Sequence, residues 1–391
     1  MNSFTYWSPT KVVFGAGTVG QAGVEAKAFG CTNTLVLYGM GSAVKSGVLD
    51  TVTAALSAEG IKYTCVGGVQ PNPLAEFAQK IVDDFRDKGI DFVLAVGGGS
   101  VIDTAKTVAN GLASPEVPIW DYFCVKETVK ASLPVGVVLT IAAAGSETSQ
   151  SAVLTNQSIG IKRGFLSPFN RPAFAVMDPE LTLTLPMRET VCGIVDILMH
   201  SLDRYFAPDA DNALTDELAE AVMRITLRYG MEAMDDLRDY KVRSELMWAG
   251  SLAHNGLTGL GQTLDFSVHQ LGQALSGRYD VPHGESLSIM WASWAMYVYA
   301  DDPTRFARYA RNVWGASSHD DIEAALFGIS MTKSFFKGIE APVSLTEALG
   351  EVTEDDIDAL AELCSFYHTR TIGAFKVLGV EDMKAIYRAA L

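Results

Sequence analysis

Two apolar stretches of the buried-strand kind run directly into glycine turns, and this pattern narrows the possible folds most. Thr34–Tyr38 is followed by Gly39-Met-Gly-Ser42, and Phe92–Val96 is followed by Gly97-Gly-Gly-Ser100. Helical spacing follows both turns, over about residues 43–59 and 103–112. Strands that are apolar along their whole length are typical of parallel sheets covered by helices on both faces. We therefore expect an α/β domain with a parallel, doubly wound sheet.

The alternation of strands and helices ends near Pro186. Further strands are expected at residues 11–15, 63–66, 135–139 and 174–177. Beyond Pro186, long segments have helical spacing and few strand signals, and these are residues 188–206, 211–229, 240–256, 303–314, 319–337 and 355–369. We predict an α/β domain over residues 1–186 and an all-helical domain over residues 187–391.

The composition is that of a folded protein with an acidic surface. Hydrophobic residues make up 48% of the 391 residues, charged residues make up 19%, and the net charge is −16. An acidic surface repels phosphate backbones, so we expect no nucleic-acid partner. Any anionic cofactor must be held by local features such as glycine turns and helix N-termini.

Cysteine usage and hydropathy predict a cytoplasmic protein. The five cysteines are odd in number and scattered, without the CxxC spacing of many metal sites, which is typical of a reducing compartment. The N-terminus shows no signal-peptide pattern, and no apolar run reaches about 18 residues, so we expect no membrane partner.

One acid and three histidines in the second domain have spacings that suit a metal ion. Asp196 and His200 are four residues apart, which places both side chains on one face of a helix. His269 and His283 are fourteen apart and would converge from a second segment. This set of ligands suits Fe²⁺ or Zn²⁺. An Asp-x-x-x-His pair alone is more often a paired or capped helix face.

The turn at residues 97–100 is a candidate phosphate loop. Its glycines let the backbone approach a pyrophosphate, and the helix that follows supplies free N–H groups. The turn is neither the usual Gly-x-Gly-x-x-Gly fingerprint nor a Walker loop, and it could be only a tight connection. Asp103 and Lys106 on that helix either reach a cleft or are a solvated carboxylate and a surface lysine.

The turn after the strand at residues 34–38 favours NADP over NAD. An acid at such a strand end commonly bonds the ribose 2′-OH, and no acid lies between Tyr38 and Ser46. Its absence leaves room for a 2′-phosphate, to which Ser42 could donate and Lys45 could add charge. The alternative is an ordinary glycine turn with no cofactor role.

Together these motifs resemble those of the iron-containing (group III) alcohol dehydrogenases, within them the branch of NADP-dependent butanol dehydrogenases and broad aldehyde reductases. The resemblance runs nearly end to end. The motifs that carry it are Pro9-Thr-Lys-Val-Val-Phe-Gly15, Tyr38-Gly-Met-Gly-Ser42, Pro71-Asn-Pro73, Gly97-Gly-Gly-Ser-Val-Ile-Asp103, Gly145-Ser-Glu147, Asp178-Pro179, Thr184-Leu-Pro186, Asp196 to His200, His269 and His283-Gly284.

The resemblance implies a dinucleotide-binding α/β domain and a helical domain in a dehydroquinate-synthase-like architecture, with metal and nicotinamide in the cleft. The implied metal ligands are Asp196, His200, His269 and His283. The implied adenosine-phosphate loop is Gly39, Gly41 and Ser42, and the implied pyrophosphate loop is Gly97, Gly98, Gly99 and Ser100. Positions implied near the nicotinamide or its ribose are Thr140, Ser146, Ser149 and Lys162. The hydroxyl groups among these could instead cap buried backbone groups.

One departure from the family pattern concerns proton transfer. Many members carry a histidine that is not a metal ligand four residues after the third ligand, and this chain has Gln273 there. A glutamine can hydrogen-bond but cannot titrate, which puts this proposed proton relay in doubt. Protons could leave through water, the ribose hydroxyls or Asp103. His254 is either a substitute for the relay or an ordinary core or surface histidine.

The implied function is a metal-dependent alcohol dehydrogenase or aldehyde reductase. It would transfer hydride between NADP(H), with NAD less favoured, and short-chain alcohols or aldehydes such as butanol and butanal, as a homodimer. The apolar or amphipathic side chains Phe165, Phe266 and Tyr279 are candidates to line the cleft and favour short aliphatic substrates.

Three alternatives stay open at this point. One is a lyase like dehydroquinate synthase, whose phosphate-bearing substrate needs more basic residues than Arg188, Arg204 and Arg278 supply near the motifs. The others are a polyol dehydrogenase of the same architecture and a non-catalytic nucleotide or metal binder.

Overall fold

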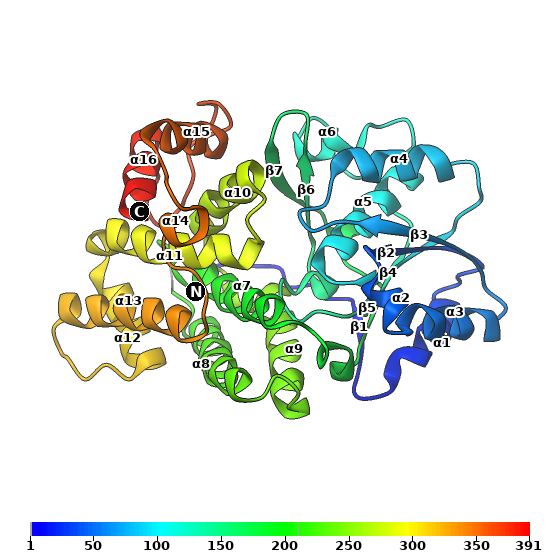
Figure 1. Cartoon of the computed structure of the whole chain (residues 1–391), viewed down its shortest axis with the longest axis horizontal. Coiled ribbons are helices and arrows are strands. Elements are labelled where there is room, and N and C mark those ends of the chain that lie inside the picture. Colours follow the sequence, from blue (N-terminus) through cyan, green and yellow to red (C-terminus); the bar gives the residue numbers. More distant parts are fainter. Residues whose placement is uncertain (1, 210) are drawn as a thin grey trace. The chain divides into compact units, whose positions relative to one another are not determined.

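The computed structural model describes residues 2–209 and 211–391, and this part of the chain forms two compact units (Figure 1). The α/β unit comprises residues 7–185 and 238–251. The helical unit comprises residues 186–237 and 252–391 together with the N-terminal residues through Tyr6. The predicted fold class is confirmed, because a parallel sheet with helices is followed by a helical part.

A parallel sheet is the frame of the α/β unit. In the described residues it has six strands in the order β1-β8-β5-β4-β2-β3. Its strands are β1 (Lys11–Phe14), β2 (Asn33–Gly39), β3 (Lys62–Val69), β4 (Phe92–Gly97), β5 (Val135–Leu139) and β8 (Phe174–Met177). Each lies where the sequence predicts a strand, and the pairings between neighbours are parallel.

Two hydrophobic cores lie on the two faces of this sheet. Helices α4 (Ala75–Phe85), α5 (Gly99–Ala113) and α6 (Ile119–Phe123) cover one face, and α1 (Gln21–Ala28) and α3 (Val48–Ala58) cover the other. Successive side chains of β2 alternate between the cores: Leu35 and Leu37 pack in the first and Val36 in the second. Burial on both faces explains why the inner strands β2, β4, β5 and β8 are mainly apolar.

Two other elements contribute to the packing of this unit. Helix α9 (Tyr240–His254) places Met247 in the first core. An antiparallel hairpin of β6 (Ser151–Asn156) and β7 (Ile161–Leu166) packs against α5 and α6. The hairpin is not evident from the sequence, because polar side chains such as Lys162 and Arg163 interrupt the apolar pattern of its strands.

The strand order reverses between β2 and β4. The chain leaves β2 for β3 on one side of the sheet and leaves β4 for β5 on the other. In open α/β sheets, the loops at the carboxyl ends of the two strands at such a reversal form a binding crevice. The pairing of Tyr38 with Val96 places the turns after β2 and β4 side by side.

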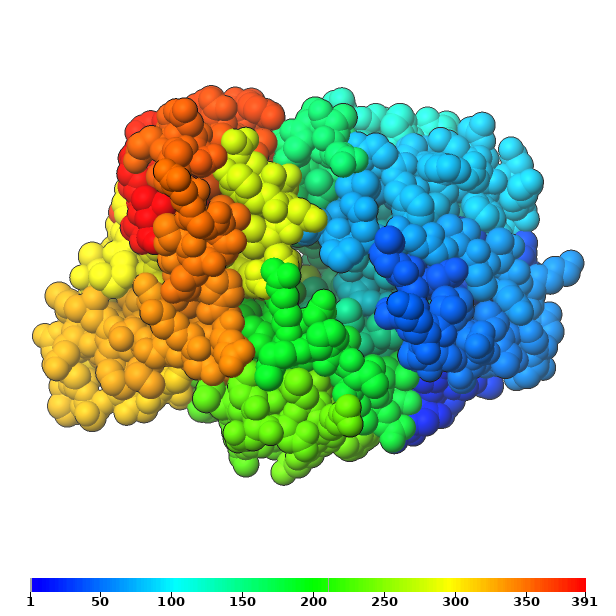
Figure 2. All heavy atoms as spheres, in the orientation of Figure 1, coloured from blue at the N-terminus to red at the C-terminus, as the bar shows by residue number. Residues whose placement is uncertain are grey.

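The helical unit is built around α11 (His283–Val298), whose Trp291 and Trp294 are fully buried. Its neighbours include α7 (Met187–Tyr205), α10 (Ser267–Tyr279), α13 (Asp321–Gly338) and α16 (Val380–Ala389). The other helices described here are α8 (Ala213–Asp235), α12 (Pro303–Trp314), α14 (Leu345–Leu349) and α15 (Glu354–Cys364). In the space-filling view, orange and red atoms of the C-terminal helices lie against the yellow α10 and α11 (Figure 2).

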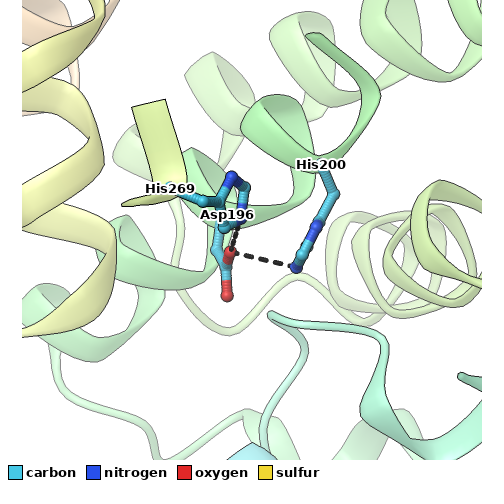
Figure 3. A group of neighbouring side chains, drawn as sticks. All are labelled: Asp196, His200 and His269. Atoms are coloured by element: carbon cyan, nitrogen blue, oxygen red, sulfur yellow. Dashed lines mark ion pairs between the residues drawn. The ribbon is translucent and has the colours of Figure 1, made fainter. Parts of the chain in front are cut away.

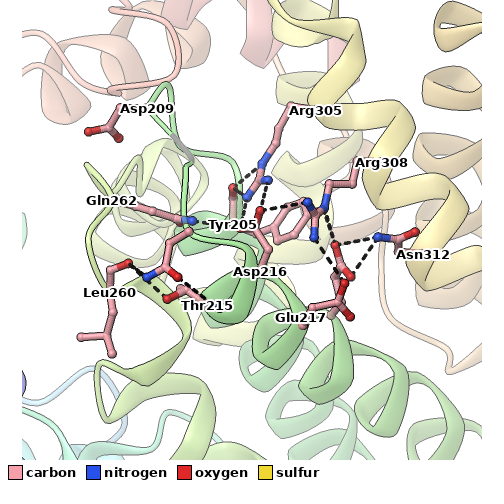
Figure 4. Close-up of polar contacts among 12 residues, drawn as sticks. Tyr205, Asp209, Thr215, Asp216, Glu217, Leu260, Gln262, Arg305, Arg308 and Asn312 are labelled. Atoms are coloured by element: carbon pink, nitrogen blue, oxygen red, sulfur yellow. Dashed lines mark hydrogen bonds and ion pairs between the residues drawn. The ribbon is translucent and has the colours of Figure 1, made fainter. Parts of the chain in front are cut away.

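A buried network of charges joins α7, α8 and α12 (Figure 4). The two Nη atoms of Arg305 each donate to the Asp216 carboxylate at 2.7 Å, and its Nε donates to the carbonyl oxygen of Tyr205 at 2.9 Å. One turn further along α12, Arg308 donates to Glu220 at 2.9 Å. The network fixes the relative position of these three helices.

The same network holds the segment that precedes α10. Gln262 donates to Asp216 at 2.9 Å, and the Leu260 carbonyl accepts from Asn212 at 3.1 Å and from Thr215 at 3.2 Å. The N-terminal turn of α8 therefore anchors the segment that leads into α10.

No helix within residues 2–209 and 211–391 is long and apolar enough to cross a membrane.

Candidate functional site

The four side chains predicted to bind a metal ion lie together in the helical unit. Asp196 and His200 are one turn apart on α7, His269 comes from the first turn of α10, and His283 is the first residue of α11. The Nε2 atoms of the three histidines lie 3.4, 3.7 and 3.8 Å from Asp196 Oδ1, in chain order. Figure 3 shows Asp196, His200 and His269, whose candidate ligand atoms all lie within 4.8 Å of one another.

The chemistry of these donor atoms suits a divalent cation. Asp196 Oδ1 and His269 Nε2 are buried and make no hydrogen bond in the described part of the chain. Leaving a buried polar atom without a partner costs about 1–3 kcal/mol, and more when it is charged. An ion with mixed nitrogen and oxygen ligands would satisfy both atoms. The residues present therefore fit a resident Fe²⁺ or Zn²⁺ ion.

The Nδ1 atom of His269 has an acidic neighbour, whereas the Nδ1 atom of His200 has a basic one. His269 Nδ1 lies 2.6 Å from Asp203 Oδ2, whereas His200 Nδ1 lies 3.2 Å from Arg204 Nη1. Burial lowers the pKa of His200 well below its ordinary value, and neighbouring histidines and Arg204 lower it further. Burial acts in the same direction on His269, but the neighbouring carboxylates of Asp196 and Asp203 outweigh it and raise the pKa of His269.

Sequence reasoning missed Asp203 altogether and counted Arg204 only as one of few basic residues. Both are buried, with exposed fractions of 0% and 4%. A spacing of seven residues from Asp196 places Asp203 two turns along the same face of α7. Asp196, His200 and Asp203 therefore share one helix face, and this spacing is the sequence signal that could have identified Asp203.

Two residues considered for proton transfer also lie in the helical unit. The ring of His254 stacks on His200, with ring centroids 3.9 Å apart and an interplanar angle of 27°. Gln273 lies on α10, one turn after His269, and is partly buried. His254 is therefore a neighbour of the ligand cluster.

The turns predicted to hold a dinucleotide lie at the carboxyl ends of neighbouring strands. β2 ends at Gly39 and β4 ends at Gly97, and Thr140 follows β5 and donates its N–H to the Gly97 carbonyl at 3.1 Å. The two loops, residues 39–42 and 97–100, therefore flank the reversal of strand order, where such sheets bind ligands. Ser42, in the first of these loops, is exposed to solvent.

Packing also requires glycine in the second of these turns. A Cβ atom on Gly97 would lie 2.5 Å from a methyl group of Val101, and one on Gly98 would lie 3.0 Å from Ile141. Helix α5 begins at Gly99, so the N–H groups of its first turn lie at this edge of the sheet. Both the tight packing and the binding of a phosphate by backbone N–H groups require residues without a side chain at these positions.

Lys106 is completely buried beneath the segment that contains Ser146 and Ser149. Its Nζ donates to Ser146 Oγ at 2.7 Å and to the carbonyl oxygens of Ser146, Ser149 and Ser151 at 2.7, 3.2 and 2.8 Å. Burial lowers the pKa of Lys106 to about 8. The reading of Lys106 as a surface lysine is wrong, because a segment about forty residues later in the chain covers it.

Asp103 is likewise held within the α/β unit and is not a solvated carboxylate. Its Oδ1 accepts from Ser146 Oγ at 2.6 Å, and its Oδ2 accepts from the Val153 N–H at 3.0 Å. Burial raises the pKa of Asp103. Lys162, on the hairpin, donates to Asn72 at 2.8 Å.

The three side chains considered as cleft-lining have different surroundings. Phe266 lies beside the metal ligands, with its ring centroid 5.1 Å from that of His269. Phe165 packs edge-on against Phe123 at 4.7 Å, and the Tyr279 hydroxyl donates to Asp356 at 2.7 Å. Of the three, Phe266 is the one next to the ligand cluster.

Comparison with known families covers nearly the whole chain. Residues 9–179 match the model of the iron-containing alcohol dehydrogenases. Residues 190–391 match the model of the C-terminal part of the Fe-containing alcohol dehydrogenase family.

Individual relatives match over their full length. The NADH-dependent butanol dehydrogenase A of Clostridium acetobutylicum is 36% identical, over 99% of both chains. The NADPH-dependent aldehyde reductase YqhD of Escherichia coli is 32% identical, over 100% of both chains. A crystal structure of NADH-dependent butanol dehydrogenase A from Thermotoga maritima superposes with a TM-score of 0.96 at 35% identity, over 100% of this chain and 99% of that one.

Proposed function

The chain belongs to the iron-containing alcohol dehydrogenase family, and from this premise we propose that it interconverts short-chain aldehydes and alcohols, such as butanal and butanol, with NADP(H). Enzymes of this kind are oxidoreductases that act on alcohols or aldehydes with NAD(P). The relatives give no support to a dehydroquinate-synthase-like lyase.

The observation that carries the proposal is the convergence of Asp196 with His200, His269 and His283. When bound, the divalent ion supplies Lewis-acid polarisation of the substrate oxygen, and the reduced nicotinamide supplies the hydride. The candidate donor atoms of Asp196, His200 and His269 lie within 4.8 Å of one another, and all three residues are buried. Preorganised groups of this kind contribute to catalysis because they need little rearrangement in the transition state.

The loop after β2 supports the choice of NADP. No carboxylate lies between Tyr38 and Ser46, so nothing in this loop repels a 2′-phosphate, and the exposed Ser42 hydroxyl can donate to it. The relatives are divided, since the Clostridium enzyme is named for NADH and the Escherichia coli enzyme for NADPH. In this proposal the loop at residues 97–100 holds the pyrophosphate.

The position one turn after His269 on α10 is occupied by Gln273, and in this proposal no histidine relays the proton from there. Gln273 can position a water molecule by hydrogen bonding but cannot carry the proton itself. Asp103 accepts hydrogen bonds from Ser146 and from the Val153 N–H, and in this proposal it holds Ser146 in place. Protons then leave through water or the ribose hydroxyls.

Initial rates with purified protein test the substrate and the cofactor. NADPH absorbance is followed with butanal, and NADP⁺ reduction with butanol, with NADH and NAD⁺ in parallel. We expect turnover in both directions and a higher kcat/KM with the phosphorylated cofactor. Turnover with NADH alone would overturn the NADP preference, and no turnover of any simple aldehyde would overturn the substrate class. The predicted homodimer and cytoplasmic location are tested separately, by sedimentation and by cell fractionation.

A further inference from the structure

Asp203 joins the helix that carries two of the candidate metal ligands to the helix that carries the third. Its carboxylate is completely buried in the last turns of α7. Oδ2 accepts from the His269 ring Nδ1 at 2.6 Å and from the His269 backbone N–H at 3.2 Å. In the described chain, the hydrogen bonds of this carboxylate therefore both end on His269.

These two bonds fix different properties of one residue. The bond to the backbone N–H ties the first turn of α10 to α7, because this N–H is one of those at a helix start that have no partner within the helix. The bond to Nδ1 sets the rotation of the imidazole. A carboxylate accepts but does not donate, so Nδ1 carries the proton and Nε2 presents its lone pair toward Asp196.

We propose that Asp203 is the positioning residue of the metal centre, which orients His269 and selects the tautomer able to bind the ion through Nε2. This inference rests on the proposed metal site. A carboxylate behind a ligating histidine also strengthens the histidine as a donor, and loss of such a partner typically lowers metal affinity by about 10- to 100-fold. Asp203 touches neither substrate nor cofactor in this role.

The next residue in the chain offers a matched comparison. Arg204 is as buried as Asp203 and also contacts a ligand histidine, donating to the His200 carbonyl at 2.7 Å and lying 3.2 Å from His200 Nδ1. A guanidinium has donors only, so it does not favour a proton on Nδ1. Its positive charge also repels a divalent cation. Removing Arg204 should therefore not weaken ion binding, although it removes a buried charge and its hydrogen bonds.

The experiment measures Zn²⁺ affinity of the full-length protein by competition with a chromophoric chelator, for wild type and for Asp203→Ala, Asp203→Asn and Arg204→Met. We expect a loss of about 10- to 100-fold for Asp203→Ala. Asp203→Asn keeps an acceptor oxygen without the charge and should recover part of that loss. Arg204→Met should bind Zn²⁺ at least as tightly as wild type. A second readout is the visible spectrum of the Co²⁺ form, which should change for Asp203→Ala because the ligand geometry changes.

The outcomes separate the possible explanations. If Asp203→Ala keeps wild-type Zn²⁺ affinity and the wild-type Co²⁺ spectrum, the inference is wrong. If Asp203→Ala and Arg204→Met lose affinity equally, the effect is general damage to the helical unit and the inference is also wrong. If Asp203→Ala does not fold, Asp203→Asn is compared with Arg204→Met instead, and weaker Zn²⁺ binding in Asp203→Asn alone supports the inference. Failure of wild type itself to bind Zn²⁺ or Fe²⁺ would instead refute the proposed metal site.

Discussion

Gly284 lies against the backbone of Cys192 so closely that a Cβ atom added to it would be 2.3 Å from the Cys192 carbonyl oxygen and 2.5 Å from its Cα. This contact joins the first turn of α11 to α7. Because the neighbouring atoms are backbone, a side chain at position 284 forces the helices apart. His283, the adjacent residue, would move with α11 away from the ligands on α7.

Gly284→Ala should therefore weaken the metal site and the fold together. We expect a stability loss of about 1–3 kcal/mol, as for other overpacked positions, and weaker Zn²⁺ binding by chelator competition. Gly338→Ala is the matched control, because its Cβ would make only an ordinary contact with Met231 at 3.6 Å. The control should keep wild-type Zn²⁺ affinity. Unchanged affinity in Gly284→Ala would show that His283 does not depend on this contact.

The buried ammonium of Lys106 makes stability depend on pH. Its folded-state pKa is about 8, below the ordinary value of 10.5. Between these two values the unfolded state binds more protons than the folded state, so the stability of wild type rises with pH relative to a variant without the amine. Comparing wild type with Lys106→Met at pH 8 and at pH 10.5, we expect the difference in unfolding free energy to change by roughly 3 kcal/mol in favour of wild type. A difference that stays constant across this range would mean that Lys106 titrates normally.

The network in Figure 4 predicts a large cost for losing one arginine. Arg305→Ala leaves the buried Asp216 carboxylate without its two hydrogen bonds from the guanidinium. Removing one partner of a buried pair typically costs about 3–5 kcal/mol. Arg228→Ala breaks an exposed pair with Glu232 on the surface of α8 and should change stability by no more than about 0.5 kcal/mol. Urea unfolding, followed by tryptophan fluorescence, measures the free energy of unfolding of both variants. Equal losses of stability would contradict a structural role for the network.

Gln273→His should restore a titratable group one turn after His269. We expect the pH profile of kcat to gain an ionisation near the ordinary histidine pKa of about 6.5. Gln273→Leu, which can neither titrate nor hydrogen-bond, serves as the comparison and should lower kcat without adding an ionisation. If Gln273→His leaves both the activity and the pH profile unchanged with every substrate, no proton relay has been lost at this position.

Much of the fold could be predicted because its signals are local. The central strands of the parallel sheet are short apolar runs, and two of them, β2 and β4, end in glycine turns that the structure places side by side. The hairpin of β6 and β7 was missed because polar side chains interrupt its apolar pattern, and its packing against α5 leaves no local signal in the sequence. The assignment of residues 238–251 to the α/β unit is likewise a matter of tertiary contacts, such as that of Met247 with the first core.

The residues of the site likewise fall into those that local spacing indicates and those that only tertiary contacts reveal. The helical spacing of Asp196 and His200 could be read directly, and His269 and His283 could be added from the sequence as a second pair of candidate ligands. The resemblance to a family then implied all four together. The burial of Lys106 could not be read, because the oxygens that surround its ammonium come from the turn and strand that begin about forty residues later. The bond between Asp203 and His269 joins residues 66 positions apart and is visible only when α7 and α10 are placed together.

The most direct test of a catalytic metal centre at Asp196 is to titrate metal-free protein with Fe²⁺ or Zn²⁺ under anaerobic conditions while following NADPH oxidation by butanal. Activity should be absent without metal and should rise to a plateau at one ion per chain. His200→Ala, which loses one ligand, should neither bind the ion tightly nor recover activity, and its circular dichroism spectrum checks that it is folded. Full activity in the metal-free protein, or equal recovery in His200→Ala, would contradict the assignment of this cluster as the centre of catalysis.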